Sequence, residues 1–163
     1  MGTMKTVLAL AALLAAAVPA TAASAPKSKD KKSSSPTLST QREVRAALDA
    51  LVDAFVAKDP AKFMSLVAED YTGEAGILDT SIRDTFLKFI DMDIRCTPDN
   101  ITADAKSKNV SIAATYSRSY TAVKTTRRIK KTGSAVLIFK RVGKSLKLYS
   151  SRGPFLFTLD DLP

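Results

Sequence analysis

The 163-residue sequence contains no histidine. Histidine is the side chain whose unperturbed pKa lies nearest neutrality, and it is the commonest metal ligand in proteins. Its absence excludes every reaction that depends on a histidine acid or base. A metal-hydrolase centre is not expected either, because the sequence also lacks paired cysteines. We therefore expect neither a metal ion nor a cofactor.

Cysteine occurs once, as Cys96. No intramolecular disulfide can form, so the stability of the fold must come from its hydrophobic core. No histidine is present to act as a base for this thiol, and the residue is predicted to be a small, buried, apolar side chain on a strand. An intermolecular disulfide is the alternative that the sequence leaves open.

Acidic residues are missing from most of the second half of the chain. Residues 105–159 contain 13 Lys or Arg and no Asp or Glu, whereas residues 37–104 contain 7 basic and 13 acidic residues. The second half should therefore carry a positive field. Its cations either cover solvent faces and protect edge strands from aggregation, or they meet an anionic partner such as lipid headgroups, acidic glycans, a phosphorylated ligand or an acidic protein face. Nucleic acid is not expected as a partner, because no nucleic-acid-binding module is visible.

An apolar run covers residues 7–18 and follows Lys5. Pro19 and the small residues 20–22 come next, as in the cleavage region of a secretory signal peptide. A run of about a dozen residues is too short to span a bilayer, which takes about 20. Residues 1–22 are therefore predicted to be a signal peptide. The product is predicted to be exported, either periplasmic or secreted, and not integral to a membrane after cleavage.

Serine and lysine dominate residues 23–37, which are predicted to form a disordered linker. This linker is either a spacer or a basic tether to an anionic envelope surface. Residues 38–163 are predicted to form one domain, because a chain of this length and hydrophobic content needs no second one.

Helical spacing of apolar residues marks the first part of this domain. Thr40 and Glu43 match a capping box, which predicts a helix that begins near Gln41. Its apolar residues recur at helical intervals: Val44, Leu48, Leu51, Val52 and Phe55. Asp59 is the predicted cap of a short second helix that opens at Pro60, where a missing N–H costs nothing.

A third helix is predicted from a cap at Asp79 or Thr80 to about Met92. After it the side-chain pattern repeats every two residues. Over residues 110–121, larger side chains alternate with small, mostly polar ones, as in a long strand with two different faces. Further strands are predicted at these positions: 94–102, 125–131, 134–141 and 145–152. Turns are expected between them: 106–109, 132–133 and 142–144. The short connections predict that consecutive strands are neighbours in one sheet.

Two segments, KDPAKF at residues 58–63 and LVAEDY at residues 66–71, lie between the first helix and the third. Together with the order of helices and strands, they resemble the nuclear transport factor 2-like superfamily over residues 38–157. The resemblance implies an α+β fold, in which N-terminal helices pack on a curved, mostly antiparallel sheet that forms a cone with a central cavity. Members include ketosteroid isomerases, dehydratases, polyketide cyclases and noncatalytic binding modules, so the fold alone does not select a function.

Enzymes of this superfamily place a carboxylate base and a hydrogen-bond donor inside the cavity, where burial shifts the pKa of an acid. The resemblance therefore suggests Asp70 or Asp99 as a base and Tyr116 as a donor. Capping and turn roles are the alternative for both aspartates. Dehydratase chemistry that requires histidine is excluded.

Side chains suited to ligand binding are more numerous than carboxylates in the predicted sheet. We expect the cavity to be lined by aromatic and basic residues: Tyr71, Tyr116, Arg118, Tyr120, Tyr149 and Arg152. A guanidinium among tyrosines can hold a ligand carboxylate through two parallel hydrogen bonds, although each arginine can equally be an exposed strand charge. Residues 153–157 are predicted either to close the core or to form an aromatic lid.

These features predict an exported, noncatalytic binding protein that holds a small amphipathic or anionic ligand or a protein partner. One alternative is a lyase or isomerase of the ketosteroid isomerase or polyketide cyclase type, with an aspartate base and a cavity tyrosine. A second alternative is an envelope assembly protein that interacts through its basic sheet face. A homodimer formed through the sheet is also expected.

Overall fold

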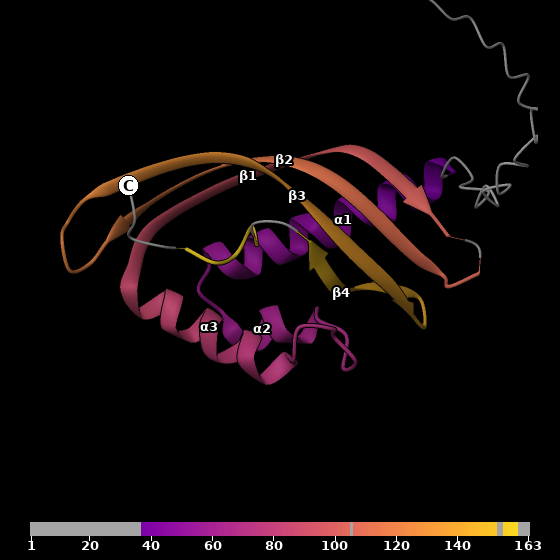
Figure 1. The fold of residues 1–163 in the computed structure, drawn as a ribbon, viewed down its shortest axis with the longest axis horizontal. Helices are drawn as coiled ribbons and strands as arrows, with labels where there is room; N and C mark the ends of the chain where they lie inside the picture. The colour runs from indigo at the N-terminus through magenta and orange to yellow at the C-terminus, as the bar shows by residue number, and fades with distance from the viewer. Residues whose placement is uncertain (1–36, 105, 153–154, 160–163) are drawn as a thin grey trace, which may run out of the picture. The chain divides into compact units, whose positions relative to one another are not determined.

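Three helices precede four strands in the computed structural model, which describes residues 37–104, 106–152 and 155–159 (Figure 1). The helices are α1 (Leu38–Val56), α2 (Pro60–Ser65) and α3 (Ala75–Lys88). The strands are β1 (Phe89–Ala103), β2 (Asn109–Ala122), β3 (Arg128–Val142) and β4 (Ser145–Arg152). The predicted signal peptide and all but the last residue of the predicted linker lie outside the described residues.

The strands form one antiparallel sheet in the order β1-β2-β3-β4, so each strand pairs with its neighbour in sequence. Figure 1 shows that the sheet is strongly curved and that the helices lie on its concave side. Register shifts in the β1–β2 pairing and the β3–β4 pairing accompany this curvature, as expected where extra residues bend a strand. The predicted α+β architecture is confirmed.

The segment after α2 joins the edge of this sheet. The N–H of Ala68 donates to the carbonyl of Leu148 (2.8 Å), and the N–H of Leu148 donates to the carbonyl of Leu66 (2.9 Å). Val67 thereby forms an isolated parallel bridge with Leu148 of β4. The LVAEDY segment therefore covers part of the edge strand, whose backbone groups would otherwise be unpaired.

The N-terminus of α1 differs from the prediction. The helix begins at Leu38, and its cap is Thr37, whose hydroxyl accepts a hydrogen bond from the N–H of Thr40 (3.4 Å). The capping box of Thr40 and Glu43 is therefore wrong, and the Glu43 carboxylate instead accepts a hydrogen bond from Arg141 of β3. The cap of α2 is confirmed, because Asp59 Oδ1 accepts from the N–H of Lys62 (2.8 Å).

Helix α3 begins earlier than predicted, at Ala75, and ends at Lys88 rather than near Met92. Neither predicted cap is correct. Asp79 forms an ion pair with Arg83 one turn later (2.9 Å), and the hydroxyl of Thr80 donates to the carbonyl of Gly76 (3.0 Å). Asp79 and Thr80 therefore lie inside the helix and not at its start.

The turn predicted at residues 132–133 is wrong, because both residues lie within β3. Gly133 pairs with Tyr116 of β2, and a Cβ atom added at Gly133 would lie 2.7 Å from the tyrosine hydroxyl oxygen. The glycine is therefore needed for the close approach of an aromatic ring to a strand, not for a turn. The turn at 142–144 is confirmed, and Gly143 has the positive φ (61°) that favours glycine there.

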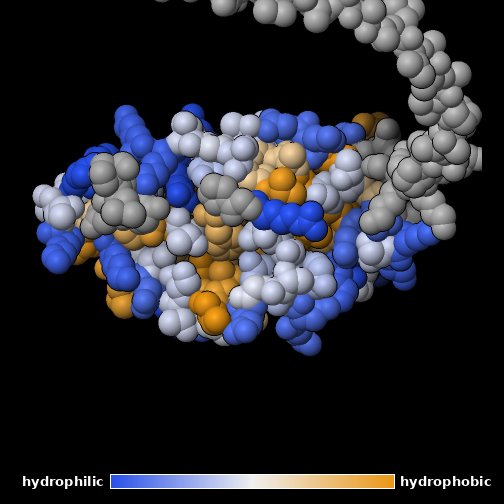
Figure 2. Space-filling view, in the orientation of Figure 1, coloured by the Kyte–Doolittle hydropathy of each residue, from blue (hydrophilic) through white to orange (hydrophobic). Residues whose placement is uncertain are grey.

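The core lies between the concave face of the sheet and the helices. Its fully buried side chains include four phenylalanines, which come from α1, α2, β3 and the C-terminal segment: Phe55, Phe63, Phe139 and Phe157. Figure 2 shows apolar surface in the region between the sheet and α2 and α3, with hydrophilic side chains around it. The helices and sheet thus share a single apolar layer.

Candidate functional site

Strand β2 places its three largest side chains on the concave side of the sheet. Tyr116, Arg118 and Tyr120 are buried, whereas Thr115 and Ser117, which alternate with them, are exposed. The alternation follows from the period of two in a strand. These three residues were predicted to face a ligand, and the structure brings them together on one strand facing the core.

Arg118 is the only charged side chain that is buried among the described residues, with 6% of its surface exposed. Its Nη1 donates to the carbonyl oxygens of Leu156 (2.7 Å) and Phe155 (3.3 Å). Its Cζ lies 5.2 Å from the centre of the Tyr116 ring, a distance typical of a cation–π contact. Its Nε is buried and has no hydrogen-bond partner. Among the described residues, the guanidinium is therefore held by neutral groups, and its buried Nε donor is unused.

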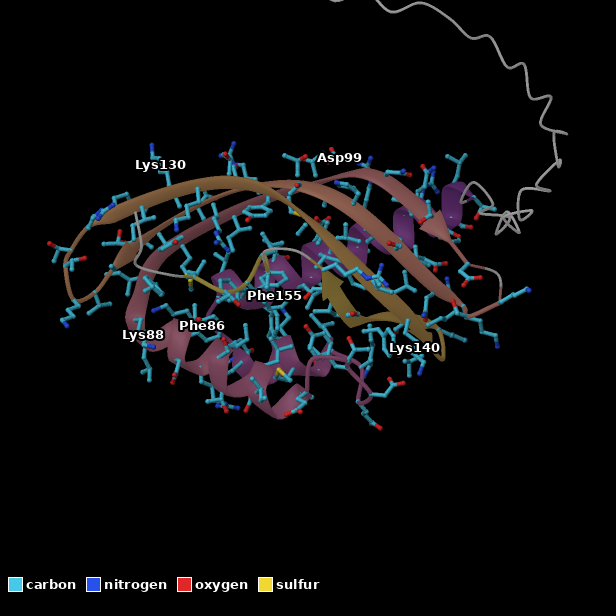
Figure 3. All side chains as sticks on the ribbon, viewed as in Figure 1. Phe86, Lys88, Asp99, Lys130, Lys140 and Phe155 are labelled. Carbon is cyan, nitrogen blue, oxygen red and sulfur yellow. The ribbon has the colours of Figure 1, made fainter. Side chains whose placement is uncertain are left out.

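The C-terminal segment lies over this arginine. Figure 3 shows Phe155 between the sheet and the helices, and the Phe157 ring packs against those of Phe55 (5.2 Å) and Phe63 (5.0 Å). Leu156 and Phe157 are completely buried, whereas Phe155 is half-buried. Of the two interpretations of residues 153–157, closure of the core describes residues 155–157, and residues 153 and 154 lie outside the described part of the chain.

The other predicted ligand-binding residues do not join Arg118. The Tyr71 hydroxyl lies 3.4 Å from Ser151 Oγ at the β4 edge. Tyr149 lies at a register shift in β4, with its ring 5.4 Å from Lys140 Nζ. Arg152 ends β4 and is exposed. The predicted set therefore divides into the buried group on β2 and separate positions on or beside β4.

Both candidate bases are exposed. The hydrogen bond from Lys140 holds the pKa of the Asp70 carboxyl below its usual value, which is opposite to the shift that a general base needs at neutral pH. Asp99 accepts a hydrogen bond from the hydroxyl of Thr115 (2.6 Å), a residue of the exposed set on β2. No Asp or Glu is buried in the described part of the chain. Tyr116 is buried, and neither the Asp70 nor the Asp99 carboxylate is among its described hydrogen-bond partners.

Cys96 is half-buried on β1, as the sequence suggests for a small apolar side chain. Burial raises the pKa of its thiol to about 11, and the negative charges of Asp99 and Asp49 contribute to the rise. A thiol with such a pKa is protonated at neutral pH and is therefore a poor nucleophile.

A depression of about 350 Å³ lies in the sheet surface and was not foreseen from the sequence. It is lined by polar and charged residues of three strands: Asp93, Arg95, Ser117, Arg118, Ser119, Lys130, Lys131 and Thr132. The pairing register explains the grouping, since Arg95, Ser117 and Thr132 form one row across β1, β2 and β3. The alternation along each strand indicates which residues share a face, and the pairing register adds which of them lie side by side.

A second depression, of about 590 Å³, lies between α3 and Thr158 and Leu159. Over the ranges 37–104, 106–152 and 155–159, no cluster of three potential metal ligands is found. Within the same ranges, no helix has the length and apolar character needed to cross a membrane.

No protein-family model matches the sequence, and no curated protein matches it. Solved structures are similar in fold. A conserved protein from Planctomyces limnophilus has a TM-score of 0.61 at 14% identity, over 69% of this chain and 93% of the other. A ketosteroid isomerase-like protein from Erwinia carotovora atroseptica has a TM-score of 0.59 at 11% identity, over 71% and 95%. A protein of the nuclear transport factor 2-like family from Streptomyces avermitilis has a TM-score of 0.58 at 13% identity, over 69% and 94%.

The chain therefore has a nuclear transport factor 2-like fold, with helices followed by a curved four-stranded antiparallel sheet. Identities of this size establish the architecture and leave the activity to be argued from the side chains. On the concave side of this sheet, Arg118 is the one buried charged side chain among the described residues.

Proposed function

We propose that this chain is an exported, noncatalytic binding protein that holds a small amphipathic ligand with an anionic group on the concave side of its sheet. The observation that carries the proposal is the buried guanidinium of Arg118, which has no acidic partner among the described residues and whose buried Nε makes no hydrogen bond. A buried cation is costly unless a negative charge or a full set of acceptors compensates for it. A ligand carboxylate supplies that compensation.

The carbonyl groups of Phe155 and Leu156 occupy the position that we assign to the ligand anion. Hydrogen bonds from a guanidinium to a carboxylate are about twice as strong as those between neutral groups, and they form in parallel pairs. A ligand carboxylate would therefore replace the two carbonyls, using the donors that they leave. The half-buried Phe155 ring would give way to the apolar part of the ligand. Binding is thus an exchange with the C-terminal segment.

The lyase or isomerase alternative requires a carboxylate close to a tyrosine in the interior. Asp70 and Asp99 are exposed. Asp70 already accepts a hydrogen bond from Lys140, and Asp99 accepts one from Thr115. The geometry gives this alternative no specific support, and binding without chemistry is the simpler function for the groups that are buried.

Export is part of the proposal and is supported by the charged, apolar and small-residue pattern of residues 1–22. A protein partner in place of the small ligand, and a homodimer formed through the sheet, stay predictions. Val136 and Ile138, half-buried on β3, are apolar positions that a second subunit could cover.

Calorimetric titration with decanoate and with decan-1-ol tests the proposal, because the two probes differ in charge and share a chain length. We expect decanoate to bind and decan-1-ol to bind at least about tenfold more weakly, since hydrogen bonds to charged groups contribute about 1.5–3 kcal/mol. Arg118→Met should abolish this preference.

Arg95→Met is the matched control, because Arg95 is an exposed arginine on the neighbouring strand. It should leave the decanoate affinity unchanged. Circular dichroism would verify that both variants are folded. Equal affinities for the two probes, or decanoate binding that survives Arg118→Met, would contradict the assignment of Arg118.

A further inference from the structure

One end of the sheet combines exposed aliphatic and basic side chains. We call it the hairpin end and define it by residues from the end of α3, the start of β1 and the β2–β3 hairpin: Leu87, Lys88, Ile90, Val123, Lys124, Arg127, Arg128 and Lys130. The N–H of Val123 donates to the carbonyl of Lys88 (2.9 Å), which fixes the hairpin against the end of α3. Figure 3 shows Lys88 and Lys130 at this same end.

Three aliphatic side chains of the hairpin end are exposed to solvent. The exposed fractions are 78% for Leu87, 49% for Val123 and 40% for Ile90. Ile90 pairs with Thr121 near the end of β2, and Val123 follows the last residue of that strand. Figure 2 shows apolar surface between hydrophilic side chains at this end. Aliphatic groups gathered in this way are costly in water and indicate a surface that is covered during function.

Most of the cations around these aliphatic groups have no negative partner in the part of the chain that the structure describes. Lys124, Arg127 and Lys130 make no ion pair with a described carboxylate. Among the described residues, Arg128 donates only to neutral oxygens: the backbone carbonyl of Asp91 (2.8 Å) and the hydroxyls of Ser119 (2.7 Å) and Thr121 (3.3 Å). Its guanidinium is thus held in place, and no described carboxylate compensates for its charge.

Lys88 is the exception, with Asp84 at 3.9 Å, and the carboxylates of Asp91 and Asp93 are exposed nearby on β1. The five cations of the hairpin end outnumber these three acids. A positive surface that surrounds exposed aliphatic groups matches the two components of a bilayer surface, anionic headgroups and acyl chains.

We infer that the hairpin end docks onto the surface of an anionic phospholipid bilayer, with Leu87 and Val123 entering the headgroup region and the surrounding cations contacting lipid phosphates. The inference does not depend on the proposed ligand, because none of these residues contacts Arg118 through a hydrogen bond or ring contact. An acidic polysaccharide would be held by the cations alone. The exposed aliphatic groups favour the bilayer.

Co-sedimentation with vesicles tests this inference, using equimolar phosphatidylglycerol and phosphatidylcholine, and phosphatidylcholine alone as the neutral reference. Each cation near an anionic bilayer contributes about fivefold to partitioning. The double variant Lys124→Gln/Arg127→Gln should therefore bind the anionic vesicles about 25-fold more weakly than the unmodified chain, and binding should fall with added salt.

The matched control is Lys106→Gln/Lys144→Gln, which removes two exposed lysines from the turns at the opposite end of the sheet (Figure 1). Its partitioning should change less than twofold, because these positions stay more than a Debye length, about 10 Å, from a docked surface. Equal losses in the two double variants would overturn the inference, since they would show a general charge effect without a docking end.

A second variant separates lipid from other anionic partners. Leu87→Ser/Val123→Ser keeps every charge and alters only exposed positions, so folding should be preserved. It should weaken binding to anionic vesicles and leave binding to dextran sulfate unchanged. Vesicle binding that is unaffected by this variant would overturn the bilayer assignment and point to an acidic polymer or an acidic protein face.

Discussion

Arg118 is a side chain that the fold buries without providing hydrogen-bond acceptors for all of its donors. Alternation along β2 directs it toward the core, and the aromatic ring of Tyr116 and two backbone carbonyls receive it there. An apolar residue at this position would be easier to bury. A buried guanidinium with an unused Nε therefore lowers the stability of the fold, and the proposed ligand carboxylate would offset that loss.

Cys96 gives a prediction about stability at alkaline pH. Burial raises the pKa of the folded thiol to about 11 from the ordinary value of 9.0. The protonated thiol thus favours the folded state fully below pH 9, and this contribution is lost as the pH rises toward 11, where the unfolded chain ionises first. Urea unfolding between pH 8 and pH 11, values chosen to span roughly this window, should show a decline in the free energy of unfolding.

Cys96→Ala is the control for this decline, since lysines and tyrosines also titrate at alkaline pH. The variant should retain the part of the pH dependence that comes from those groups and lose the part due to the thiol. Superimposable pH profiles for the two proteins would show that the thiol pKa is not raised.

At the level of secondary-structure elements, the β2–β3 pairing depends on one glycine opposite one tyrosine. Gly133→Ala would bring a Cβ atom within 2.7 Å of the Tyr116 hydroxyl oxygen and within 2.9 Å of its Cζ. Overpacking of this kind costs about 1–3 kcal/mol. Alanine is otherwise preferred over glycine in a strand by about 0.5–1 kcal/mol, so the clash should determine the sign. We expect Gly133→Ala to lower the free energy of unfolding in urea.

A double-mutant cycle with Tyr116→Leu identifies the cause of that loss. Once the ring is removed, Gly133→Ala should be neutral or stabilising, because only the backbone preference for alanine remains. If the glycine substitution were equally destabilising in both backgrounds, the ring contact would not be the reason for the glycine.

The same pair shows where sequence reasoning works and where it fails. The helical spacing of apolar residues in α1 and the alternation in β2 are local patterns, and they predicted that these elements form. They also placed Tyr116, Arg118 and Tyr120 on one face of the strand, although an exposed position for Arg118 stayed open. Gly133 reads as a turn residue when only its neighbours are considered. Its actual role depends on a tyrosine on another strand, which is a tertiary contact that local propensity does not contain.

Helix ends were misplaced for a related reason. Several residues can cap a helix in principle, and the choice between Thr37 and Thr40 depended on whether Glu43 was free to complete a capping box. The Glu43 carboxylate instead accepts a hydrogen bond from Arg141 of β3. Similarly, Tyr149 was expected to line the cavity beside Arg118, and the structure separates the two because a register shift falls at Tyr149 in β4.

At the scale of the whole described fold, the C-terminal segment joins the helices to the sheet, because its Phe157 ring packs on the helices and its carbonyls accept hydrogen bonds from Arg118 of β2. Phe157 is fully buried against Phe55 and Phe63, whereas Phe155 is half-buried. Phe157→Ala should lower the free energy of unfolding by about 3–5 kcal/mol, as expected for a fully buried aromatic side chain. Phe155→Ala should lower it by less. Denaturation followed by far-UV circular dichroism measures both values.

A decanoate titration of Phe155→Ala extends this comparison to function. If Phe155 occupies ligand space, its removal should leave decanoate affinity unchanged or higher, whereas a residue that contacts the ligand would lower it. A large loss of stability in Phe155→Ala, equal to that in Phe157→Ala, would contradict the division of the segment into an anchor and a replaceable ring.

The rings of Phe55 and Phe157 come from positions roughly a hundred residues apart, and joining them closes a long loop whose entropy opposes contact until other structure has formed. We therefore expect the helices and the sheet to assemble first, and residues 155–157 to reach their place late in folding. Until then the guanidinium of Arg118 is in contact with water. Its dehydration is thus one of the final events of folding, and a ligand carboxylate available at that stage would compete with the chain's own carbonyls for the same donors.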